Sequence, residues 1–185
     1  IYGGGFSSAF IALGRNKRSI ALDLSQPEAS ALVKTLVADA DVFVTNTRPG
    51  VMDRNGLGFD ALSEINPALV YAELTGFGHC GPLAERPAYD PIIQAMSGMA
   101  AQAEDGPAQL LPQLVCDKVA GLSMAQAISA ALLDVARGAV AQKVHVSLLS
   151  ASMAFLACDT YAPLTSGERE VLSFDLSRDY APWAT

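Results

Sequence analysis

The stretch Ser19-Ile-Ala-Leu-Asp-Leu-Ser-Gln-Pro-Glu28 decides the fold, together with Asp41-Val-Phe-Val-Thr45. Its first six residues form an apolar run of strand length. A helix-start pattern follows at once, with Ser25 as a cap and Glu28 three residues later to complete a capping box. Apolar residues recur with helical spacing up to Asp39, and the run 41–45 is again strand-like. Strand, helix, strand in this order predicts parallel strands joined by a right-handed crossover.

The alternation of helices and strands continues along the chain. A turn-rich stretch covers 50–58, a helix is predicted for 59–65 and a strand for 69–74. Another helix is predicted for 90–99 and a loop for 102–112. We therefore predict an α/β protein with an open, Rossmann-like parallel sheet and flanking helices. Its ligands are expected at the carboxyl ends of the strands.

A long apolar segment begins at Asp117 and runs through 119–133. A helix that is apolar on nearly every face is normally buried in a core or an oligomer interface. The following run from Val144 to Leu149 and the alanine-rich stretch to Cys158 fit either a strand or a helix, because the apolar residues there follow neither period clearly.

The composition narrows the class of protein. The net charge of −7 argues against a nucleic-acid binder, since such affinity comes from clustered Lys and Arg. The three cysteines, Cys80, Cys116 and Cys158, show no CxxC spacing, so the chain has neither a disulfide framework nor a zinc motif and fits the cytoplasm. No uninterrupted apolar run reaches the ~18 residues of a membrane span. There is also no HExxH, no P-loop and no GxGxxG motif following the first predicted strand.

Two groups of residues are candidates for chemistry. Asp117 is a carboxylate at the head of the apolar helix, where it is either a helix cap or a nucleophile. The basic run containing Arg15, Lys17 and Arg18 is either a solvated loop or a phosphate-binding surface. Arg48 and Arg54, which follow the second predicted strand, extend the same positive surface. The glycine-rich loop 75–82 is either a flexible connection or a close approach to a ligand.

Several motifs in order resemble the family III CoA-transferases, also called the CaiB/BaiF family. The resemblance covers most of residues 10–157 and includes the Asp117 helix. The other segments that carry it are Arg15-Asn-Lys-Arg-Ser-Ile-Ala-Leu-Asp-Leu24, Ala38-Asp-Ala-Asp-Val-Phe-Val-Thr-Asn46, Arg48-Pro-Gly50, Asp53-Arg-Asn-Gly-Leu-Gly58, Asn66-Pro67, Gly76-Phe-Gly78, Gly81-Pro82, Pro87-Ala-Tyr-Asp90 and Gln94-Ala-Met-Ser-Gly98.

The resemblance implies a Rossmann-like large domain, a small domain and a homodimer of interlocked subunits. It assigns residues 1–160 to a partial large domain that holds the CoA site and the catalytic aspartate. Residues 161–185 are then a linker or the start of the small domain. The chain corresponds to the middle of such a subunit, so we expect a fragment of a longer protein.

The resemblance also assigns roles to single residues. Asp117 matches the aspartate that attacks the acyl-CoA thioester, forms an acyl-aspartyl anhydride and then an aspartyl-CoA thioester. Asn46 and Arg54 match the CoA site, with Arg48 as a further member, and Arg15, Lys17 and Arg18 match the loop near the CoA phosphates. Tyr89 matches a residue close to the acyl group.

The implied activity is transfer of CoA between an acyl-CoA and a carboxylic acid, with no metal and with CoA as a substrate rather than a tightly bound cofactor. One alternative is a 2-methylacyl-CoA racemase of the same superfamily, which has a histidine about where Tyr89 stands. Another is an inactive CoA-binding remnant.

Overall fold

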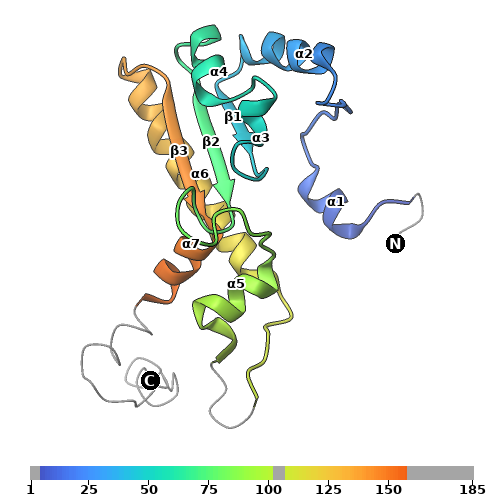
Figure 1. The fold of residues 1–185 in the computed structure, drawn as a ribbon, viewed down its shortest axis with the longest axis vertical. Helices are drawn as coiled ribbons and strands as arrows, with labels where there is room; N and C mark the ends of the chain where they lie inside the picture. Colours follow the sequence, from blue (N-terminus) through green and yellow to red (C-terminus); the bar gives the residue numbers. More distant parts are fainter. Residues whose placement is uncertain (1–4, 102–106, 158–185) are drawn as a thin grey trace, which may run out of the picture.

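The computed structural model describes residues 5–101 and 107–157. Its centre is a three-stranded parallel sheet in the order β1 (Val42–Thr45), β2 (Val70–Thr75) and β3 (Gln142–Ser147). Val44 pairs with Ala72, and Ala72 pairs with Val144 on the other side. The predicted α/β class with an open parallel sheet and flanking helices is confirmed (Figure 1). The boundary expected near residue 160 and the segment 161–185 lie outside the described residues.

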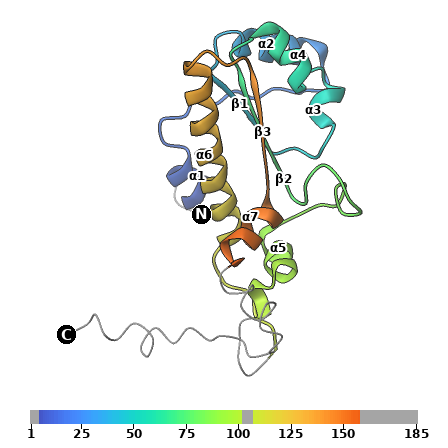
Figure 2. The same cartoon turned by 90° about the vertical axis from the view of Figure 1, so that its left-hand side faces the viewer.

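Helices cover both faces of the sheet and its carboxyl end. Figure 2 shows α6 along one face, with α3 and α4 on the other side of the strands. Below the strands in Figure 1, α5 and α7 lie at the end towards which β2 points. The helices are α1 (Ser8–Leu13), α2 (Pro27–Val37), α3 (Val51–Arg54), α4 (Phe59–Ile65), α5 (Asp90–Ser97), α6 (Val115–Ala136) and α7 (Leu148–Phe155), with a 3₁₀ turn at Met99–Ala101.

Two hydrophobic clusters hold these layers together. On one face, Tyr71 of β2 packs with Leu62 of α4 and with the rings of Phe43 and Phe59. On the other face and at the strand ends, Cys116 and Ala120 of α6 join residues of α5 and α7. Successive side chains of a strand point to opposite faces, and nearly every residue of β2 is buried, including the polar Glu73 and Thr75, so β2 is covered on both faces.

The strand predicted at 19–24 is wrong. This segment has no regular secondary structure and runs into a turn at Leu24, and Ile20 is 58% exposed. A strand exists only through hydrogen bonds to a neighbour, and among the described residues β1 pairs with β2 alone. The parallel crossovers that do form connect β1 to β2 and β2 to β3.

The start of α2 also differs from the prediction. Its N-cap is Gln26, which makes no side-chain capping bond, and Pro27 occupies the first turn. Ser25 does not cap, because its hydroxyl and its backbone N–H both donate to the carboxylate of Asp23, at 2.7 and 3.0 Å. Because Ser25 bonds to Asp23, the predicted capping box with Glu28 does not form.

The remaining predictions match the structure closely. The helix at 59–65 is α4, and the predicted strands at 41–45 and 69–74 are β1 and β2. The predicted turn-rich stretch 50–58 contains the short helix α3, and the helix predicted for 90–99 ends at Ser97. The ambiguous segment after 143 divides into strand and helix, with β3 ending at Ser147 and α7 starting at Leu148.

Helix α6 is only partly covered. Cys116, Ala120, Met124 and Ala131 are buried, whereas Leu122 is 71% exposed. By length and composition alone α6 is apolar enough to cross a membrane, a test that core helices of soluble proteins also pass. Within the described residues, α6 is therefore buried on one face only, and not on nearly every face as its apolar sequence predicts.

Asn66 gives a test of how the layers are tied together. Its amide donates to the carbonyls of Val37 and Ala40, at 3.0 and 2.8 Å, while its oxygen accepts from the N–H of Ala68. Asn66→Asp keeps the size but turns an oxygen towards two carbonyls. We expect it to lower the free energy of unfolding of the full-length protein by about 1–3 kcal/mol. Denaturant titration measures this, and an unchanged midpoint would show that these bonds contribute nothing.

Candidate active site

A cavity of about 510 Å³ opens at the carboxyl end of the sheet. This volume lies within the range of small-molecule sites. Its wall combines the ends of all three strands with the segment before α5 and the first turn of α6. The lining residues are Asn46, Thr47, Arg48, Pro49, Leu74, Thr75, Gly76, Ala84, Arg86, Pro87, Ala88, Tyr89, Asp117 and Leu148.

The strand order explains why these residues meet. Asn46 and Arg48 follow β1, Thr75 ends β2, and Leu148 directly follows β3. Parallel strands place their carboxyl ends at one edge of the sheet, which is where ligands of open α/β sheets bind. The cavity thus lies at the carboxyl ends of the strands, where the sequence analysis predicts ligand binding.

Among the described residues, Asp117 is the one that brings a carboxylate to this wall. It lies in the first turn of α6, whereas the N-cap position belongs to Leu114, so the side chain of Asp117 is not the cap of this helix. The positive end of the helix dipole favours its negative charge. Partial burial, and then the nearby carboxylate of Asp90, nevertheless raise the pKa of Asp117 above the ordinary aspartate value. The residue is exposed at the cavity wall, its carboxylate is only partly desolvated, and it forms no ion pair within the described residues, so it is accessible for nucleophilic attack.

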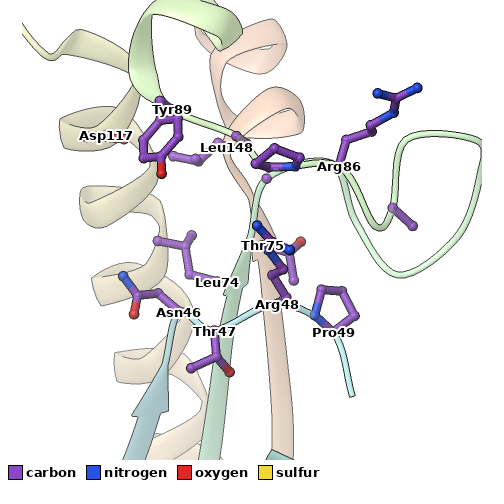
Figure 3. A pocket seen from close by; sticks show the side chains of 14 residues that line it. Asn46, Thr47, Arg48, Pro49, Leu74, Thr75, Arg86, Tyr89, Asp117 and Leu148 are labelled. Carbon is purple, nitrogen blue, oxygen red and sulfur yellow. The ribbon is translucent and has the colours of Figure 1, made fainter. Parts of the chain in front are cut away.

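Three other predicted residues share the cavity with Asp117. Figure 3 shows Tyr89 and Asn46 at two ends of the cavity with Leu74 between them. Tyr89 directly precedes Asp90, whose carboxylate accepts from the backbone N–H of Asp117 at 3.0 Å. Tyr89 and Asp117 therefore belong to the same end of the cavity, while Asn46 and Arg48 belong to the strand end.

The other predicted basic residues lie elsewhere. Arg54 lines a separate cavity of about 380 Å³ together with Lys34 and the start of α2. Arg15, Lys17 and Arg18 belong to the exposed segment after α1, and none of them lines the cavity around Asp117. In Figure 1 this part of the chain lies away from the sheet. Their assignment to the CoA phosphates stays a prediction.

Sequence reasoning did not single out Thr75, Arg86 or Leu148, which also line the cavity. The available signal was position: Thr75 directly follows the predicted strand 69–74 and begins the glycine-rich loop, and Leu148 lies in the segment that fitted either a strand or a helix. Arg86 had no such signal because it lies in a loop, and in Figure 3 its guanidinium points away from the other labelled side chains.

The glycine-rich loop is held by a polar cluster on the sheet. The N–H of Gly78 donates to Thr75 Oγ1 at 3.0 Å, and that hydroxyl bonds to His145 Nε2 at 2.9 Å. The rings of His79 and His145 lie 4.1 Å apart, and Glu73 pairs with His79 at 3.3 Å. Burial lowers the pKa of His145, so its neutral ring serves as a hydrogen-bond partner here. Gly76 of this loop lines the cavity, and the choice between a flexible connection and a close approach to a ligand stays a prediction.

Among the described residues, no group of three or more His, Cys, Asp or Glu side chains is arranged to hold a metal ion. The two ion pairs in that part of the chain both involve Glu73 and neither involves Asp117.

The fold and the cavity define an α/β protein with a cavity at the carboxyl edge of a parallel sheet. The model of CoA-transferase family III matches residues 2–180. An acetyl-CoA:oxalate CoA-transferase of Acetobacter aceti is 41% identical over 158 residues, and a succinate–glutarate CoA-transferase of Agrobacterium fabrum is 39% identical over 158 residues. The crystal structure of a CaiB/BaiF family protein from Brucella suis superposes with a TM-score of 0.79 at 38% identity. This chain belongs to CoA-transferase family III.

The chain spans about two fifths of the length of these relatives. The alignments cover 84% of this chain in each of the three cases, but 41% and 40% of the two curated proteins and 42% of the Brucella chain. The expectation that this segment corresponds to part of a longer subunit agrees with these shares.

Gly76 tests how tightly the cavity wall is packed. A Cβ at this position would overlap the Cβ of Ala88, while the carbonyl of Gly76 accepts from the N–H of Leu149 at 3.1 Å. We expect Gly76→Ala to displace the segment that carries Tyr89 and to lower the free energy of unfolding by about 1–3 kcal/mol.

Gly121→Ala is the matched control for Gly76→Ala. No atom lies within 4 Å of the Cβ that it would add to α6. It should stabilise the helix by about 0.5–1 kcal/mol. Equal effects of the two alanines in thermal unfolding would contradict the packing described here.

The raised pKa of Asp117 predicts a pH dependence of stability. A carboxyl whose folded-state pKa is raised contributes most favourably below its ordinary value of 3.8 and loses that contribution as the pH rises through the folded-state pKa. Compared with Asp117→Asn, the unmodified protein should therefore lose stability as the pH rises from about 3 towards 6. Parallel melting curves measure this, with Asp134→Asn at the other end of α6 as the control. A constant difference between the two proteins would contradict the raised pKa of Asp117.

Proposed function

We propose that the full-length protein is a CoA-transferase that moves CoA between an acyl-CoA and a carboxylic acid, with Asp117 as the covalent nucleophile. The observation that carries this proposal is the position of Asp117. Among the described residues, it is the carboxylate in the wall of the cavity at the carboxyl ends of the strands. Its pKa is raised by partial burial and then by Asp90. Membership of the family supports the same reaction.

The proposed reaction needs four displacements. The Asp117 carboxylate attacks the donor thioester carbonyl, its C–O bond forms, and the C–S bond breaks to release CoA thiolate. The thiolate then attacks the aspartyl carbonyl of the mixed anhydride and expels the donor carboxylate. An acceptor carboxylate attacks the aspartyl thioester and frees the thiolate again. The thiolate finally attacks the new acyl carbonyl, which yields the product acyl-CoA and restores Asp117.

Side chains of the cavity wall offer groups that can bind the substrates in these steps. Asn46 and Arg48 offer hydrogen-bond donors at the strand ends, which suits the polar pantetheine and phosphates of CoA. Tyr89 is 70% exposed beside the cavity and fits a position next to the acyl group. We assign Arg54, Arg15, Lys17 and Arg18 to the CoA phosphates, a role for which their positive charge is the support.

The remaining assignments rest on the family. We propose a homodimer of interlocked subunits in the cytoplasm, with residues 1–160 in the large domain and no tightly bound cofactor. Because the curated relatives named above act on oxalate, succinate and glutarate, short dicarboxylates are the first acceptors to test.

Trapping of the intermediate tests the proposal. The full-length protein is incubated with succinyl-CoA, or separately with acetyl-CoA, and quenched with hydroxylamine before peptide mass spectrometry. A hydroxamate on Asp117 is expected, and Asp117→Asn should lower CoA exchange into glutarate or oxalate by more than about a thousandfold. Asp134→Asn in the same helix should leave both signals unchanged.

The other outcomes identify the rival activities. Deuterium incorporation at the 2-position of 2-methylacyl-CoA without CoA exchange would point to a racemase. Binding of CoA with neither signal would point to an inactive remnant, and in both cases the transferase proposal would be wrong.

A further inference from the structure

The structure contains a buried polar pair next to the candidate nucleophile that the proposed reaction does not use. Asp90 begins α5 and is 2% exposed, and Gln94 lies one turn later and is 1% exposed. Gln94 Nε2 donates to Asp90 Oδ1 at 2.5 Å. Ionised carboxylates are rarely buried this deeply unless hydrogen bonds compensate the lost hydration. Hydrogen bonds to both side chains compensate this burial.

The first partner of this pair is the start of α6. The N-cap residue Leu114 has no side-chain oxygen, so α6 begins without a cap of its own. The first N–H groups of a helix have no partner inside the helix. Asp90 Oδ2 accepts one of them, the backbone N–H of Asp117, at 3.0 Å. A carboxylate at this end of a helix is also favoured by the helix dipole.

The second partner is the segment that leads into α6. Gln94 Oε1 accepts from the N–H of Leu111 at 2.8 Å, and its amide lies 3.1 Å from the carbonyl of Gln113 and 3.4 Å from that of Leu111. Both ends of the Gln94 side chain are thus engaged. The orientation of the amide is fixed, because reversing it would set Oε1 against the Asp90 carboxylate and the NH₂ group against the N–H of Leu111.

We propose that Asp90 is a positioning residue for Asp117: its buried carboxylate, oriented by Gln94, caps α6 from α5 and fixes the Asp117 backbone at the cavity wall. This inference rests on the proposed role of Asp117 as nucleophile. A nucleophile in the first turn of a helix moves with that turn. Attack on a thioester requires the carboxylate within near-contact distance and in line with the carbonyl.

Asp90 also acts on Asp117 through its charge. The carboxylate of Asp90 is, after burial, the second cause of the raised pKa of Asp117. A neutral residue at position 90 should therefore lower that pKa. A residue that only stabilises the fold would leave it unchanged, so the pH profile distinguishes the two roles.

The experiment uses the full-length protein with Asp90→Asn, Asp90→Glu and the control Asp60→Asn. Asp60 is also in the first turn of a helix, α4, but it is exposed. The asparagine presents an NH₂ group either to the Gln94 amide or to the Asp117 N–H. We expect the rate of hydroxylamine-trapped adduct formation from succinyl-CoA to fall about tenfold to a hundredfold, with KM within about twofold of the unmodified value.

The pH profile and the conservative variant complete the test. In Asp90→Asn the acid limb of the rate should move to lower pH, and Asp90→Glu, which keeps the charge, should restore the limb to its original position. Asp60→Asn should leave rate and profile unchanged. The positioning role is wrong if Asp90→Asn traps the adduct at the rate of the unmodified protein. It is also wrong if the rate falls while KM changes by a similar factor and the acid limb stays at its original pH.

Two further measurements keep the outcomes separate. If Asp90→Asn does not fold, hydrogen exchange in the unmodified protein decides: a protected Asp117 amide supports the cap, and exchange at the rate of an exposed amide overturns it. If the unmodified protein itself forms no adduct on Asp117, the proposed function fails first. If it forms the adduct and Asp90→Asn behaves normally, only the positioning role fails.

Discussion

Parallel pairing of β2 with both of its neighbours is the constraint on which the site depends. β2 is the central strand, nearly all of its residues are buried, and its register fixes β1 and β3 in the same direction. Three carboxyl ends are then forced to one edge, where the segments after β1 and β3 bring Asn46 and Leu148 to the cavity. Buried backbone groups must be hydrogen-bonded, so this alignment cannot be relaxed locally. The cavity is a consequence of the sheet.

Much of this arrangement was predictable because it is encoded locally. Apolar runs of strand length define β1 and β2, and Asn66-Pro67 marks the end of α4, since each depends on a few adjacent residues. The position of Asp117 ahead of an apolar segment was equally visible. The predictions failed where local signals competed or where a partner was needed. Ser25 bonds to Asp23 rather than capping α2, and the run 19–24 has no neighbouring strand within the described residues.

The site itself was predictable only in part, for a related reason. Strand-end residues such as Asn46 and Arg48 follow from the topology, and so they reach the cavity. Arg15, Lys17 and Arg18 lie in a segment without regular structure, where sequence order says nothing about distance. The bond between Asp90 and the N–H of Asp117 links residues 27 positions apart. No periodicity or capping pattern reports such a contact, because the cap comes from another helix.

The same site concentrates features that oppose stability. Two carboxylates, Asp90 and Asp117, lie close together at one helix terminus, and burial disfavours the charge on Asp117. The helix dipole and the hydrogen bonds of Gln94 offset part of this cost. Among the described residues, no ion pair compensates the charge on Asp117. A carboxylate at this position, whose pKa is raised by burial and by Asp90, fits the proposed role of Asp117 as the nucleophile.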